Sequence, residues 1–94
     1  MIRVMLVDDR NLMRSALKRL IEEDGNIRVG AEVPDGESAI AVARGRGVDV
    51  AVVDTGVRNP GILETTRRLG RADEKLKILA LGDPDCAPLP SRFL

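Results

Sequence analysis

The chain alternates between short apolar runs and longer segments in which apolar residues recur at helical spacing. The apolar runs predict four strands, over Ile2–Val7, Ile27–Val33, Val48–Val53 and Leu76–Leu81. Ile27–Val33 switches between apolar and polar residues, which favours an edge strand, whereas the other runs are continuous enough for buried parallel strands.

Three segments between these runs predict helices over Asn11–Glu23, Glu37–Arg44 and Ile62–Leu69. Asp35 or Ser38 can cap the second helix, because each side chain has an oxygen that accepts from the first free backbone N–H groups. Strict alternation of strand and helix predicts an α/β fold with a parallel sheet covered on both faces. The first helix has an apolar face of Leu12, Met13, Ala16, Leu17, Leu20 and Ile21, with Arg14, Lys18 and Glu22 opposite.

Composition narrows the classes of function. The 94 residues allow one domain, over residues 1–94, and the 15 basic residues balance 15 acidic ones, so net charge indicates no nucleic-acid partner. No apolar run approaches the roughly 20 residues that cross a bilayer, and the single cysteine, Cys86, fits a reducing compartment. We therefore expect a cytoplasmic chain without membrane contact. The absence of histidine removes the commonest metal ligand and general base.

Carboxylates gather where the predicted strands end. Asp8 and Asp9 follow the first strand, Asp54 follows the third, and Asp83 follows the fourth. The carboxyl ends of parallel strands form the functional crevice of an open sheet, so we expect the first three to converge. Crowded carboxylates repel one another unless a cation or shared protons relieve the repulsion, and an oxygen-only donor set suits Mg²⁺. A carboxylate beside Mg²⁺ can attack phosphorus and form an acyl phosphate.

Simpler interpretations of these carboxylates stay open. Asp9 precedes a predicted helix and could cap it, and Asp54 precedes a loop containing Gly56 and could form an Asx turn. Their joint occurrence at matching strand ends favours a shared chemical role.

Three stretches resemble the receiver domains of two-component response regulators: Met1–Asp9, Val50–Asp54 and Leu63–Leu69. The sequence is most similar to LuxR/NarL-type regulators of the Gac-type global activator group, a resemblance that extends to the tail over residues 85–94. It implies a flavodoxin-like (CheY-like) doubly wound parallel sheet, truncated here to about four strands and three helices. The family's fifth strand, phosphate-pairing lysine and last helix would come after residue 94.

The resemblance also implies roles for individual residues. Asp54 is the expected phosphoacceptor, and Asp8, Asp9 and Asp54 are expected to hold Mg²⁺ with the backbone carbonyl of Gly56. Gly82 departs from the family, which places Ser or Thr there to bond the phosphoryl group. Because that hydroxyl and the lysine are both missing, we expect slow phosphorylation. We also expect the crowded carboxylates to bind Mg²⁺ weakly.

The resemblance implies a phosphoryl-accepting signalling module, not an enzyme, whose partner is a sensor histidine kinase or another response regulator. One alternative is a phosphorylation-defective, receiver-like binding protein that acts by occupying such a partner. Another is an aspartic protease, because Asp54-Thr55-Gly56 matches the active-site triplet of that class, whose viral-type members are nearly all-β homodimers of chains about this long. The open edge expected at Leu76–Leu81 also predicts a homodimer.

Overall fold

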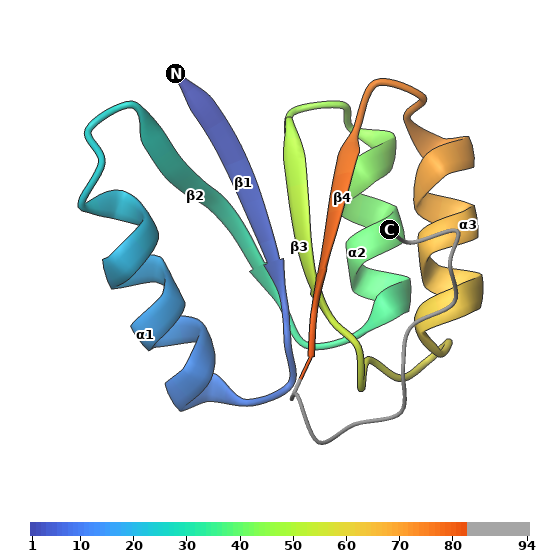
Figure 1. The fold of residues 1–94 in the computed structure, drawn as a ribbon. Helices are drawn as coiled ribbons and strands as arrows, with labels where there is room; N and C mark the ends of the chain where they lie inside the picture. Colours follow the sequence, from blue (N-terminus) through green and yellow to red (C-terminus); the bar gives the residue numbers. More distant parts are fainter. Residues whose placement is uncertain (83–94) are drawn as a thin grey trace.

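The protein, described over residues 1–82 by a computed structural model, forms a four-stranded sheet with three helices (Figure 1). This architecture confirms the predicted α/β alternation. It differs from the nearly all-β fold of the protease alternative, which therefore finds no support. In chain order the elements are β1 (Ile2–Val7), α1 (Asn11–Glu22), β2 (Ile27–Val33), α2 (Gly36–Arg44), β3 (Val50–Asp54), α3 (Ile62–Ala72) and β4 (Lys77–Leu81).

The strands lie in the order β2-β1-β3-β4, and every neighbouring pair is parallel. β1 pairs with β2 on one side, where Ile2 lies opposite Ile27, and with β3 on the other, where Val7 lies opposite Val53. The predicted edge position of Ile27–Val33 is confirmed. The strand order reverses between β1 and β3, and in open α/β sheets this is the place where ligands bind.

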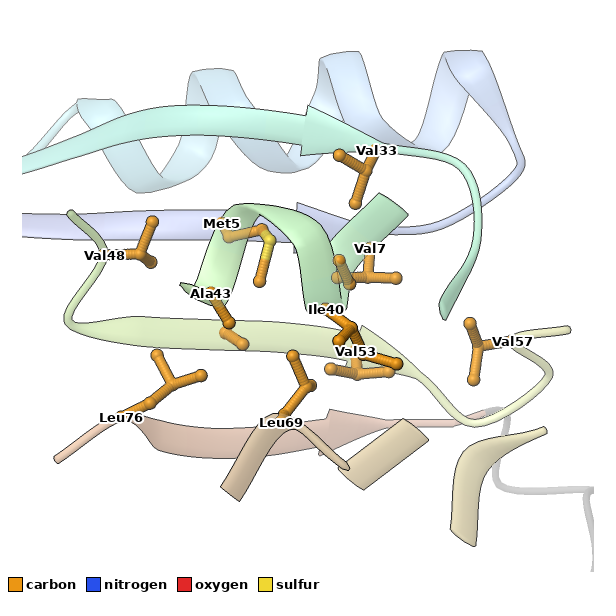
Figure 2. Close-up of a cluster of buried hydrophobic side chains, with 12 residues drawn as sticks. Met5, Val7, Val33, Ile40, Ala43, Val48, Val53, Val57, Leu69 and Leu76 are labelled. Atoms are coloured by element: carbon orange, nitrogen blue, oxygen red, sulfur yellow. The ribbon is translucent and has the colours of Figure 1, made fainter. Parts of the chain in front are cut away.

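Most of the core lies on the face of the sheet that α2 and α3 cover (Figures 1 and 2). Met5 and Val7 of β1 and Val53 of β3 point to this face. They pack with Ile40 of α2 and Leu69 of α3, and each of the five side chains is at most 1% exposed. These helices are therefore held by interlocking aliphatic side chains, as expected for a chain with one aromatic residue.

The opposite face carries a smaller core and one helix. Its buried cluster consists of Val4, Leu6, Val29 and Val52. Figure 1 shows α1 on the side of β2 and β1, and among residues 1–82 no helix covers β3 and β4 on this face. Leu17 and Ile21 are the α1 side chains that pack against the cluster.

The prediction of which α1 residues face the sheet was partly wrong. No residue of α1 is fully buried, and Leu12 and Leu20 of the predicted apolar face are 84% and 64% exposed. Arg14, Lys18 and Glu22, which the sequence pattern put on the solvent side, are half-buried instead.

Polar groups of the edge strand β2 explain this orientation. The Glu22 carboxylate accepts a hydrogen bond from the backbone N–H of Val29 at 2.9 Å. The Glu32 carboxylate lies 3.8 Å from Arg14 Nε and 3.7 Å from Lys18 Nζ. The alternation that marks Ile27–Val33 as an edge strand thus also gives α1 charged partners, so hydrophobic spacing alone misjudged the buried face.

Some element boundaries differ from the predictions. α3 continues to Ala72 instead of ending at Leu69, because Gly70 lowers helix propensity without breaking the helix. α2 starts after Asp35, whose Oδ1 accepts from the backbone N–H of Ser38 at 2.9 Å, so Asp35 is the cap.

Several expectations concern residues that the structure does not describe. They are the position of Asp83, the turn-rich segment before Pro90, the start of a helix over residues 91–94 and the role of Cys86. Among residues 1–82, no helix has the length and apolar character needed to cross a membrane.

Candidate functional site

Two of the predicted carboxylates meet at the carboxyl edge of the two central strands. Asp8 directly follows β1, and Asp54 is the last residue of β3. Asp8 is 4% exposed, and the side chain of Asp54 is 20% exposed. The parallel pairing of β1 with β3 places them side by side, as expected at a topological switch point.

Arg10 joins the two carboxylates. Its Nε donates to Asp8 Oδ1 at 2.9 Å, and its Nη2 donates to Asp8 Oδ2 at 2.8 Å, so the guanidinium binds the Asp8 carboxylate in a bidentate manner. The same Nη2 donates to Asp54 Oδ1 at 3.2 Å. The cation that the crowded carboxylates require is thus supplied, in this structure, by the chain itself.

These contacts alter the proton affinity of the groups. The hydrogen bonds from the Arg10 guanidinium hold the pKa of Asp8 below its ordinary value, against the opposing effect of burial. The Asp8 carboxylate in turn raises the pKa of Arg10, with a smaller contribution from Asp54. Both partners therefore stay ionised near neutral pH, and the contact between them is a charge-assisted hydrogen-bonded pair.

Asp54 also takes part in a local turn. Its Oδ2 accepts from the backbone N–H of Gly56 at 3.0 Å, which is the geometry of the Asx turn considered from sequence. Its Oδ1 faces Arg10. The structural and chemical interpretations of Asp54 are therefore compatible, because each uses a different carboxylate oxygen.

Asp9 is exposed and stands apart from this arrangement. The residue at the start of α1 is Arg10, which makes no side-chain capping bond, so Asp9 is not the helix cap. Within residues 1–82, no three His, Cys, Asp or Glu side chains stand close enough together to hold a metal ion. The structure thus brings Asp8 and Asp54 together through Arg10 and leaves Asp9 outside.

Gly82 lies beside Thr55 at the same edge of the sheet. The backbone N–H of Thr55 donates to the carbonyl of Leu81 at 2.8 Å, which ties the end of β3 to the end of β4. Sequence reasoning missed Arg10, and it considered Thr55 only as part of the protease triplet. Arg10 immediately follows the Asp8-Asp9 pair, and that spacing was the available signal for it.

A cavity of about 370 Å³ opens at this edge. Its lining includes Asp8, Arg10, Asp54 and Gly82, together with apolar side chains from β1, β3, β4 and α1. A small anionic or cationic group can therefore reach the carboxylates from the face of the sheet that carries α1.

The chain is similar to known regulators over its whole length. Residues 4–88 match the model of the response regulator receiver domain family. Over 94 residues the chain is 36% identical to the response regulator UvrY of Escherichia coli (strain K12), covering 100% of this chain and 43% of that protein. It is 35% identical over 96 residues to the response regulator GacA of Pseudomonas viridiflava, covering 100% of this chain and 44% of that protein. The chain thus spans less than half the length of these relatives.

Solved structures share the fold. A two-component response regulator of the LuxR family from Aurantimonas sp. SI85-9A1 superposes with a TM-score of 0.79 at 35% identity, covering 85% of this chain and 57% of that one. The CheX–CheY–BeF3–Mg²⁺ complex from Borrelia burgdorferi gives a TM-score of 0.79 at 16% identity, covering 86% and 61%, and so shows likeness of fold alone. With the family match, the sequence relatives and the parallel α/β fold in agreement, this chain belongs to the receiver domain family of two-component response regulators.

Proposed function

We propose that Asp54 is the phosphoacceptor of this receiver domain. The observation that carries the proposal is the meeting of Asp8 and Asp54 around one cationic group at the switch point of the sheet. Asp54 is partly open to solvent, lines the cavity and is fixed in orientation by the Gly56 N–H. A carboxylate held in this way is prepared to attack phosphorus from the cavity.

The transfer is a displacement at phosphorus. One Asp54 carboxylate oxygen forms the new O–P bond, and the bond between phosphorus and the donor breaks, with its electron pair leaving on the donor. We propose a phosphorylated sensor histidine kinase as the donor in a two-component system, so that this chain receives the phosphoryl group and is not itself the enzyme. Another response regulator stays the alternative partner.

The donor set at this edge fits Mg²⁺ in its chemistry, because the side chains of Asp8 and Asp54 offer only oxygen and already surround a positive group. We propose that Asp8 and Asp54 would hold the ion, with Asp9 acting through water and the Gly56 carbonyl as a further ligand. When bound, Mg²⁺ supplies positive charge between the carboxylates and the phosphoryl oxygens.

Intact mass spectrometry with acetyl phosphate and Mg²⁺ tests the proposal. We expect the mass gain of one phosphoryl group, absent in Asp54→Asn, and slow, incomplete labelling, because one preorganised donor can be worth about 10²–10³ in rate and residue 82 has no hydroxyl. A phosphoryl group on a residue other than Asp54 would contradict the assignment. Complete absence of labelling would favour the phosphorylation-defective binding protein.

A further inference from the structure

We infer that Arg10 controls the affinity of this site for a divalent cation. Its guanidinium competes with the cation for Asp8 and Asp54 and so sets how tightly the cation binds. The inference rests on the proposed function, since it assigns control of cation binding at the same carboxylates.

The competition follows from which oxygens Arg10 uses. The guanidinium engages both Asp8 side-chain oxygens, at 2.9 and 2.8 Å, and one oxygen of Asp54, at 3.2 Å. A Mg²⁺ ion binds carboxylate oxygens at about 2.0–2.1 Å and demands near-octahedral geometry. An ion between these carboxylates would meet the fixed positive charge of Arg10 within a few ångströms, so the two cations exclude each other.

Arg10 is also the partner that can leave. Its side chain is 54% exposed, whereas that of Asp8 is 5% exposed and held at the end of β1. The backbone N–H of Arg10 separately donates to Asp8 Oδ1 at 2.9 Å, and Arg14 Nη1 donates to the Asp8 carbonyl at 2.5 Å. Asp8 therefore stays in place when the guanidinium swings into solvent, and the rearrangement is confined to one long side chain.

The contact differs from an ordinary surface ion pair. Exposed pairs join two flexible, hydrated side chains and contribute little. Here a planar fork meets a buried carboxylate with two parallel hydrogen bonds, a geometry that lysine cannot reproduce. The identity of residue 10, and not only its charge, should therefore determine the affinity for the cation.

Calorimetric titration with Mg²⁺ alone tests the inference on the parent chain, Arg10→Gln, Arg10→Lys and Arg28→Gln. Arg28 is an exposed residue near the start of β2, so it lies at the amino ends of the strands, away from Asp8 and Asp54. Replacing it with Gln changes the net charge by the same amount as Arg10→Gln. We expect Arg10→Gln to lower the Kd for Mg²⁺ by about threefold to tenfold, Arg10→Lys to give an intermediate value, and Arg28→Gln to match the parent. Circular dichroism verifies that each variant is folded.

The outcomes separate this inference from the proposed function. Equal Kd values for the parent and a folded Arg10→Gln overturn the inference while leaving the acceptor site standing. Equal effects of Arg10→Gln and Arg28→Gln also overturn it, because net charge alone would then govern affinity. If neither the parent nor Arg10→Gln binds millimolar Mg²⁺, both the inference and the proposed metal site fail.

Discussion

The side chain of Thr55 fills the space that a larger residue at position 82 would need. A Cβ atom placed on Gly82 would lie 2.6 Å from Thr55 Oγ1 and 3.1 Å from Thr55 Cγ2. A hydroxyl thus stands beside position 82 although Gly82 carries none, and the two residues are sterically coupled.

This coupling predicts a non-additive effect on stability. We expect Gly82→Ala to lower the free energy of unfolding by about 1–3 kcal/mol, because the new methyl group overpacks against Thr55. Thr55→Ala should recover most of that loss in the double variant, which urea unfolding of all four proteins measures. Gly30→Ala is the control, since nothing lies within 4 Å of a Cβ there. Additive effects of the two substitutions would show that Thr55 does not fill this space.

The Asp8–Arg10 contact predicts a pH-dependent contribution to stability. The pKa of Asp8 is held low in the folded state, so the unfolded chain binds more protons as the pH falls. The stabilisation is therefore present above the unfolded value, about pH 3.9, and is lost as the pH drops through the folded value. We expect Arg10→Gln to unfold at a higher pH than the parent in an acid titration followed by circular dichroism. Identical acid midpoints would mean that Arg10 does not hold the Asp8 charge in solution.

The exposure of two leucines predicts that the helices on the two faces of the sheet contribute unequally to stability. Leu69 of α3 is fully buried, whereas Leu20 of α1 is 64% exposed. We expect Leu69→Ala to cost about 2–5 kcal/mol of unfolding free energy and Leu20→Ala to stay within about 0.5 kcal/mol of the parent. Chemical denaturation measures both. Similar losses would mean that Leu20 is buried against the sheet in solution.

The exposed face of β4 predicts self-association. Leu79 and Leu81 are 52% and 40% exposed, on an edge strand of the described sheet. Burying such a surface in a symmetric dimer is favourable, so we expect sedimentation at micromolar concentration to show a dimer. Leu79→Glu should weaken it, whereas Leu63→Glu, on an exposed position of α3, should not. A folded monomer whose mass does not change on dilution would contradict this prediction.

The sequence predicts the element order and the placement of Asp8 and Asp54 because these follow from simple patterns. Continuous apolar runs predict buried strands, and acids at the ends of parallel strands must share one edge. What these patterns do not contain is the orientation of α1, which depends on polar partners in β2 such as Glu32. Hydrophobic spacing predicts the orientation of a helix from its apolar side chains alone. It contains no information on the ion pairs that decide which side of α1 faces the sheet.

The contact of Arg10 with Asp8 and Asp54 could not be predicted from the sequence for a related reason. The crowded carboxylates were expected to be relieved by a cation or by shared protons, and the expected cation was Mg²⁺, whereas the structure places Arg10 beside both of them. An arginine two residues after Asp8 can fold back over it only if the turn into α1 has the right conformation, which one sequence does not specify. Likewise, the spatial relation of Thr55 to Gly82 exists only once β3 and β4 are paired.

The weak anchoring of α1 makes the site sensitive to local opening. Because α1 has no fully buried residue, its amide hydrogens should exchange with solvent through an opening of lower free energy than that of the central strands β1 and β3. Arg10 immediately precedes α1, so an opening that includes the first turn of the helix should displace the guanidinium from Asp8 and Asp54. Local opening of α1 thereby adds a second route, besides rotation of the exposed Arg10 side chain, by which the two carboxylates lose their internal cation.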